Sequence, residues 1–148
     1  MRNIKFLLVV LGITAITSVS NVFAYYSIAS LAGIKVPAHN GSKTTGIKTV
    51  PTSAMGYSAH VVDNVSINPS GDELDVKIRK YDSGKIVKEG DWKILKTGTD
   101  TILTENWEFL FQGADFDLLI DSRWYYTKTT TINNGTWGMQ YFDQYLKI

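Results

Sequence analysis

The chain contains no cysteine, and this absence removes several classes of protein at once. Without thiols there can be no disulfide framework, no thiolate zinc site and no cysteine nucleophile. A knottin or a disulfide-framed growth factor is therefore excluded. The fold must be held together by apolar burial and hydrogen bonding.

Histidine is scarce, and His39 and His60 are the only two. They do not form the H-x-x-x-H or H-E-x-x-H spacing of a zinc site, so we expect no metal and no cofactor. Ser58 and His60 would share one face of a strand, whereas Asp63 would point to the other face. We therefore expect an ordinary strand here rather than a catalytic triad, which depends on geometry.

Blocks of charge of one sign are also absent. The full chain carries 15 Lys and Arg against 14 Asp and Glu, and the charges are interspersed. This pattern lacks the basic footprint of a nucleic-acid binder and the polybasic cluster that attracts anionic lipid. We expect no nucleic-acid partner and no stable insertion into a membrane.

Long apolar runs are missing as well, except near the start. Arg2 and Lys5 precede an apolar run at residues 6–16, about half of the ~20 residues that span a bilayer. Val22 and Ala24 then place small residues at the −3 and −1 positions of a signal-peptidase site. The pattern predicts a secretory signal peptide, cleaved after Ala24, and a secreted protein. An uncleaved N-terminal anchor is the alternative.

The predicted mature chain begins at Tyr25 and has the size of a single domain. Residues 25–56 are rich in Thr, Gly and Ser, which favours loops with edge strands at 34–36 and 47–50. Residues 57–148 form the expected core of the same domain.

The clearest structural pattern is the alternation at residues 74–81. Leu74, Val76 and Ile78 alternate with charged residues, which predicts a half-buried strand. β-branched and aromatic residues favour further strands along the chain. These are expected at residues 25–30, 57–67, 85–88, 92–96, 101–104, 107–111, 116–120, 125–132 and 136–142.

Turn residues separate these segments. A tight turn is expected at residues 82–84, and a type I′ hairpin turn at Asn133-Asn134-Gly135, because Asn-Gly readily adopts positive φ angles. No segment after the leader has a helical period. We therefore predict an all-β protein, an antiparallel β-sandwich of roughly seven to nine strands, in preference to a closed barrel.

Acidic residues cluster around the strand expected at 116–120. A solvated strand edge is the simplest interpretation, but carboxylates could also bind calcium or act as a glycosidase pair. A small secreted hydrolase is therefore the alternative function. The carboxylates concerned are Glu105, Glu108, Asp115, Asp117 and Asp121.

Aromatic residues are abundant towards the C-terminus. Exposed rings could stack on sugars or anchor a protein partner, and the alternative is that they seal the ends of the sandwich. The candidate binding residues are Trp124, Tyr125, Tyr126, Trp137 and Tyr141. The sequence thus favours a secreted, non-enzymatic protein that binds a cell-surface, glycan or protein partner. Self-assembly through strand edges is a third possibility.

Three pieces of the chain carry a resemblance. The threonine-rich residues 44–52, the alternating residues 74–81 and Gly135-Thr136-Trp137 resemble small secreted β-proteins of Gram-positive bacteria. The general plan is similar to that of the lactococcin-type bacteriocins, which are secreted, cysteine-free β-sandwiches. This similarity implies killing of related bacteria by engaging a cell-wall precursor. No functional residue can be carried over from it.

Overall fold

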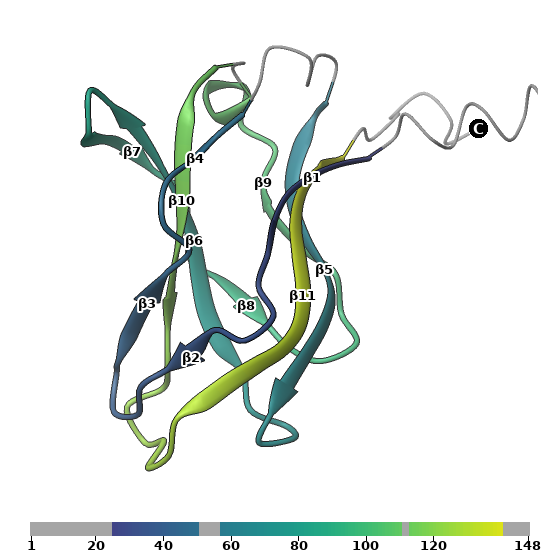
Figure 1. Cartoon of the computed structure of the whole chain (residues 1–148), viewed down its shortest axis with the longest axis vertical. Coiled ribbons are helices and arrows are strands. Elements are labelled where there is room, and N and C mark those ends of the chain that lie inside the picture. Colours follow the sequence, from purple (N-terminus) through teal and green to yellow (C-terminus); the bar gives the residue numbers. More distant parts are fainter. Residues whose placement is uncertain (1–24, 51–56, 111–112, 141–148) are drawn as a thin grey trace, which may run out of the picture.

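The computed structural model describes residues 25–50, 57–110 and 113–140 (Figure 1). These residues form eleven strands and one short 3-10 helix, and no α-helix occurs among them. The strands make two antiparallel sheets that pack together, so the all-β prediction is confirmed. A search of this part of the chain finds no helix that could cross a membrane.

The first sheet, called the β11 sheet, has its longest strand near its middle. Its order is β1, β11, β5 and β9, and β2 also pairs with β11. The strands are β1 (Tyr25–Ser30), β2 (Lys35–Val36), β5 (Ala59–Asn68), β9 (Thr101–Thr104) and β11 (Thr130–Gln140).

The second sheet, called the β10 sheet, has the order β3, β10, β6 and β7, with β4 beside β10 and β8 beside β6. Its central strand β10 is flanked on both sides, as the apolar sequence of residues 116–120 predicts. The strands are β3 (Ser42–Thr44), β4 (Lys48–Thr49), β6 (Leu74–Asp82), β7 (Lys85–Glu89), β8 (Lys93–Leu95) and β10 (Asp115–Asp121).

The core lies between the two sheets and is built by alternation along the strands. On β6, Leu74, Val76 and Ile78 are completely buried, while Lys77 and Arg79 are only partly covered. The predicted half-buried strand is therefore confirmed. The other fully buried large side chains are Leu31, Leu95, Leu103, Phe109, Phe116, Leu118, Ile120, Ile132, Trp137 and Met139.

The hairpin between β6 and β7 turns where the sequence predicts it. Ser83 has a φ of 51° and Gly84 a φ of 77°. Two successive positive φ angles are what a type I′ turn requires. The short Ser83-Gly84 connection sets the pairing of β6 with β7.

The predicted hairpin at Asn133-Asn134-Gly135 is wrong. These residues lie inside β11, and none of the three is among the described residues with a positive φ. Both sides of the segment are occupied, because Asn134 pairs with Ser66 of β5 and the Gly135 carbonyl accepts a hydrogen bond from the Leu31 N–H at 2.8 Å. The extra residues become irregularities in the β11–β5 register instead of a turn.

The strand expected at residues 107–111 is also wrong. Trp107–Phe109 form a 3-10 helix, η1, and Phe111 lies outside the described residues. The Asn106 side chain accepts a hydrogen bond from the Glu108 N–H at 3.0 Å and so caps this turn. Phe109 points into the core and Trp107 points outward, so the aromatic alternation does not form one inward face.

Residues 25–50 contribute to both sheets. They supply β1 and β2 to the β11 sheet and β3 and β4 to the β10 sheet. The strand at Ser42–Thr44 was not expected from the sequence. The eleven described strands exceed the roughly seven to nine predicted. β2, β4 and β8 lie within the strands expected at residues 34–36, 47–50 and 92–96, but each has only two or three residues.

Candidate functional site

Residues 122–129, which connect β10 to β11, are called the aromatic loop. The strand expected at 125–132 begins only at Thr130, so the three consecutive aromatic residues lie on this loop and not on a strand. Trp124 is 71% exposed and Tyr125 is 58% exposed, whereas Tyr126 is partly covered. Two of the three rings therefore face solvent.

The three rings pack edge to face along the loop. The Trp124 and Tyr125 rings lie 5.6 Å apart at an interplanar angle of 87°, and the Tyr125 and Tyr126 rings lie 5.0 Å apart at 82°. Edge-to-face packing places the positive edge of one ring against the negative face of the next. The exposed pair is therefore supported from behind by Tyr126.

Tyr126 fastens the aromatic loop to the rest of the fold. Its hydroxyl accepts a hydrogen bond from the Glu73 N–H at 2.8 Å, beside the start of β6. Its carbonyl accepts a hydrogen bond from the His39 N–H at 3.1 Å. Burial raises the pKa of the Tyr126 hydroxyl, so the group stays neutral over the physiological pH range.

Arg123 adds a second attachment at the base of the loop. Its guanidinium lies 3.2 Å from an Asp75 oxygen and 3.6 Å from a Glu73 oxygen. Its carbonyl accepts hydrogen bonds from the N–H groups of Tyr126 and Asn40. These contacts join the loop to β6 and to the segment before β3, so the exposed rings stand on a fixed base.

A shallow concavity of about 170 Å³ opens beside the exposed rings. The turn between β5 and β6 forms one wall of it and the aromatic loop forms the other. The Asp72 carboxylate accepts a hydrogen bond from the Thr130 hydroxyl at 2.9 Å, which holds this carboxylate at the rim. The lining residues are Pro69, Asp72, Tyr125, Tyr126, Thr127 and Lys128.

Trp137 does not belong to this surface, which corrects the prediction for that residue. It is completely buried on β11, because its position in the strand alternation points it between the sheets. Its indole N–H donates to His60 Nδ1 at 3.2 Å. Tyr141, the remaining aromatic candidate, lies outside the described residues.

His60 is a core residue. It is completely buried, and its Nε2–H donates to the Phe109 carbonyl at 2.8 Å while Nδ1 accepts the Trp137 N–H. Both ring nitrogens are thus occupied, and neither is left for Ser58 or Asp63. The predicted strand is present as β5, but His60 faces the core and not a polar surface.

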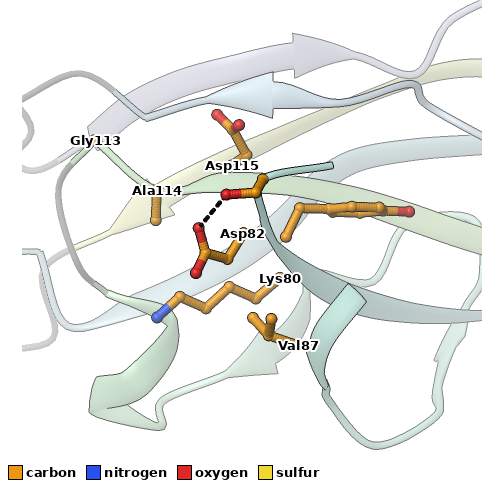
Figure 2. Close-up of a pocket in the computed structure, with 8 residues that line it drawn as sticks. Lys80, Asp82, Val87, Gly113, Ala114 and Asp115 are labelled. Carbon is orange, nitrogen blue, oxygen red and sulfur yellow. Dashed lines mark hydrogen bonds between the residues drawn. The ribbon is translucent and has the colours of Figure 1, made fainter. Parts of the chain in front are cut away.

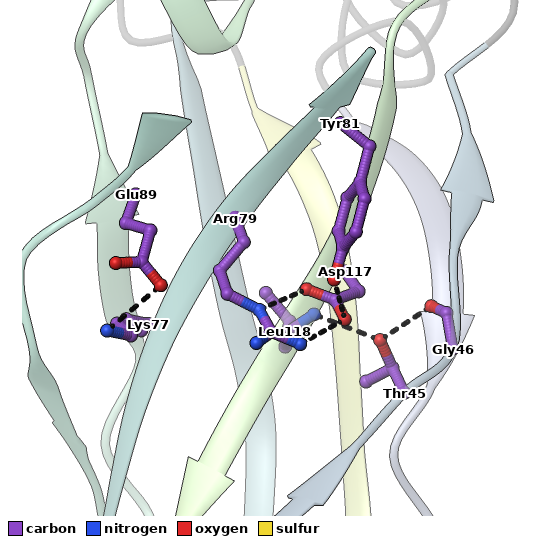
Figure 3. A network of polar contacts seen from close by, with 8 residues as sticks. All are labelled: Thr45, Gly46, Lys77, Arg79, Tyr81, Glu89, Asp117 and Leu118. Carbon is purple, nitrogen blue, oxygen red and sulfur yellow. Dashed lines mark hydrogen bonds and ion pairs between the residues drawn. The ribbon is translucent and has the colours of Figure 1, made fainter. Parts of the chain in front are cut away.

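The carboxylates around β10 are held in structural contacts. Figure 3 shows Arg79 and Tyr81 of β6 converging on Asp117 of β10. The Asp117 oxygens accept from Arg79 Nε at 2.8 Å, from Arg79 Nη2 at 2.6 Å and from the Tyr81 hydroxyl at 2.9 Å. Asp117 is only 3% exposed, so the solvated edge expected at this position is wrong.

Three of the four other carboxylates of this group also have partners. Asp115 accepts from the Thr49 hydroxyl and Asp121 from the Ser42 hydroxyl, both at 2.6 Å. Glu108 forms an ion pair with Lys88, and Glu105 is exposed. Within the described ranges, no three His, Cys, Asp or Glu side chains gather in a way that could hold a metal ion.

A larger pocket of about 400 Å³ lies at the other end of β10, where the β6–β7 hairpin meets the start of that strand (Figure 2). Lys80, Asp82 and Asp115 are among the residues that line it. Lys80 Nζ donates to the Glu108 carbonyl at 2.8 Å and Asp115 is bound by Thr49, so both groups already have protein partners.

Of the two residues at the predicted cleavage site, Ala24 lies outside the described residues, and Tyr25 is the first residue of β1. Tyr25 pairs with Gln140 of β11.

Sequence reasoning missed Asp72 and Lys128, which flank the aromatic pair. Asp72 lies between the strands expected at residues 57–67 and 74–81, and Lys128 is one of twelve lysines. Nothing local marks either residue, because the fold brings them together across more than fifty positions. The one usable signal was the run of three aromatic residues itself.

Comparisons place no known protein beside this geometry. No protein-family model, no curated protein and no solved structure matches the chain.

Proposed function

We propose that the protein is a secreted, non-enzymatic β-sandwich that binds a partner on cell surfaces through its aromatic loop. The observation that carries this proposal is the pair Trp124 and Tyr125, which are 71% and 58% exposed on a well-anchored loop. Large exposed rings are unfavourable in water unless something covers them, and aromatic residues dominate binding hot spots.

The anchoring of the loop supports binding. A partner that contacts Trp124 and Tyr125 does not have to order the loop, because Tyr126 and Arg123 already hold it through backbone hydrogen bonds and ion pairs. A preorganised contact avoids part of the entropy cost of association. The predicted leader supplies the route to the extracellular space.

The test is attachment to intact cells. The full chain is expressed with its own leader, recovered from the medium, labelled and added to washed Gram-positive cells, and the bound fraction is measured. We expect Trp124→Ala and Tyr125→Ala each to weaken attachment by at least tenfold, because truncation of a central aromatic hot spot typically costs about 2 kcal/mol or more.

Trp107→Ala is the matched control. Trp107 is 67% exposed, nearly as much as Trp124, but it lies on η1 before β10, whereas the aromatic loop follows β10 (Figure 1). It should leave attachment unchanged. Equal attachment of all three variants and the wild type would exclude the aromatic loop, and recovery of the chain only inside the cells would exclude secretion.

A further inference from the structure

We infer that the aromatic loop binds a neutral saccharide, with one sugar ring seated between Tyr125, Asp72 and Lys128. This inference rests on the proposed function and specifies its ligand. These three residues line the concavity of about 170 Å³. It is smaller than the roughly 300–1,000 Å³ of ordinary small-molecule pockets, so it suits a single ring at the surface.

The aromatic rings match the faces of a sugar. A pyranose has C–H groups on its faces, and these carry a slight positive charge. The face of an aromatic ring is negative and apolar, so the two surfaces attract each other. Tyr125 lines the concavity and Trp124 stands beside it with its ring centroid 5.6 Å away, which extends the apolar contact beyond one sugar ring.

The polar groups at the rim match the edge of a sugar. Each sugar hydroxyl can both donate and accept, so a site needs acceptors and donors side by side. A carboxylate has about four acceptor positions, and Thr130 occupies one of those on Asp72. Lys128 is exposed and makes no hydrogen bond or ion pair with any described residue, so its ammonium group can donate.

The charges around the site favour a neutral ligand. Asp72 and Lys128 carry opposite charges on the same rim, and Arg123 behind them faces both Glu73 and Asp75. Carboxylates therefore outnumber cations here. A phosphorylated or acidic sugar would meet repulsion from Asp72 without a surplus of positive charge to offset it.

A protein partner fits these features less well. The centre of a protein interface is depleted in charged residues, and its hot spots sit in fully desolvated apolar surroundings. Here the exposed rings lie beside the polar side chains of Asp72, Thr127 and Lys128. These polar side chains match the hydroxyl groups of a carbohydrate.

The experiment is affinity electrophoresis of the exported protein in gels that contain dextran, mannan or galactan as neutral probes, or alginate as an anionic probe. We expect retardation by at least one neutral polysaccharide and none by alginate. Trp124→Ala and Tyr125→Ala should abolish the retardation. Asp72→Asn and Lys128→Ala should each raise the dissociation constant by about tenfold, equivalent to about 1.4 kcal/mol.

Two charge controls separate the site from general surface effects. Asp91→Asn and Lys96→Ala change exposed residues outside the concavity and should leave the retardation unchanged. If the neutral polysaccharide retarded the Asp72→Asn and Lys128→Ala variants as strongly as the wild type, the inference would be overturned. Stronger retardation by alginate than by any neutral probe would overturn it as well.

The cell-attachment assay keeps this inference distinct from the proposed function. Should the wild type attach to cells through Trp124 but bind none of the neutral polysaccharides, the saccharide inference is wrong and a protein ligand replaces it. Should attachment itself not depend on Trp124, the proposed function fails together with the inference.

Discussion

At the scale of single residues, His60 is a polar side chain that is completely buried in the core. It joins three parts of the fold, because it lies on β5, donates to Phe109 of η1 and accepts from Trp137 of β11. The Trp137 N–H requires an unprotonated Nδ1, so the proton of the neutral ring sits on Nε2. Burial lowers the pKa of His60 to about 4, and the hydrogen bond to Phe109 opposes this shift.

This histidine should make the fold sensitive to acid. The unfolded chain binds a proton near the ordinary histidine pKa of about 6.5, whereas folded His60 does so only near 4, so the free energy of unfolding decreases as the pH falls between these values. The decrease attributable to His60 can reach ~3 kcal/mol. Urea unfolding of the exported protein at pH 7, 5.5 and 4.5 measures it.

The control is His60→Gln, which keeps one N–H donor for the Phe109 carbonyl and one oxygen acceptor for the Trp137 indole but cannot titrate. Its unfolding free energy should depend less on pH than that of the wild type. His39 is present in both proteins, so any contribution from it cancels. Parallel pH profiles would contradict the assignment of the acid sensitivity to His60.

At the scale of elements, β1 packs against β11 through an aromatic side chain that lies over a glycine. Tyr25 lies over Gly138 on the side of the sheet away from the core, and its hydroxyl reaches Asp63 of β5 at 3.5 Å. Burial, and then the charge of Asp63, raise the pKa of the Tyr25 hydroxyl. The packing of β1 against β11 therefore requires that Gly138 has no side chain.

Gly138→Ala should loosen this attachment. An added Cβ would overlap the Tyr25 ring and approach the Tyr26 backbone carbonyl oxygen to 2.6 Å. The ring could rotate away, but the carbonyl belongs to β1 itself, so the strand would have to shift. Overpacking of this kind costs about 1–3 kcal/mol, and thermal unfolding should show a melting temperature lower by several degrees.

Gly135→Ala is the matched control on the same strand. An added Cβ there would meet its nearest neighbour, Leu31 Cβ, at 3.5 Å, which is an ordinary contact distance. This variant should melt close to the wild type. A Gly138→Ala protein as stable as the Gly135→Ala protein would show that Tyr25 does not pack on Gly138 in solution.

At the scale of the whole molecule, parts of the sheet edges consist of very short strands, beside the longer edge strands β1 and β7 of six and five residues. β2, β3, β4 and β8 contain two or three residues each, and each includes a lysine. Short edge strands that carry lysine resist pairing with a second chain, because a partner strand would have to bury the charge. The lysines concerned are Lys35, Lys43, Lys48 and Lys93.

We therefore predict that the exported protein is a monomer. Multi-angle light scattering should give the mass of one chain at every concentration from micromolar to millimolar. A mass that increases with concentration would instead favour the self-assembly that strand edges could support. The wild type is sufficient for this test, because no variant is needed to expose the edges.

Local sequence was a good guide wherever the structure depends on near neighbours. The alternation around Val76 predicted β6 correctly, and Ser83-Gly84 formed the expected turn. Asn134-Gly135 has similar turn chemistry but runs straight through β11, because β5 pairs along one side and Leu31 bonds to the other. Tertiary pairing overrides turn propensity when both edges of a segment are engaged.

The candidate site was predicted only in part, for a similar reason. The run of aromatic residues marked residues 124–126 as candidates, and Trp124 and Tyr125 are exposed, but the same reasoning included Trp137, which is completely buried. Whether an aromatic ring points to solvent or to the core depends on the register of its strand. That register is set by pairing with strands that are distant in the sequence. Asp72 could not be recognised at all, because it reaches the site only through the packing of the β5–β6 turn against the aromatic loop.

By itself the sequence determined that the described chain folds into strands with one apolar face, since a period of two in hydrophobicity is a local property. It also determined the absence of disulfides, because there is no cysteine. Only the tertiary structure decided which rings point to solvent and which charges share a rim with them. Those relations join residues far apart in the chain, and sheet register and the packing of the two layers set the distances between them.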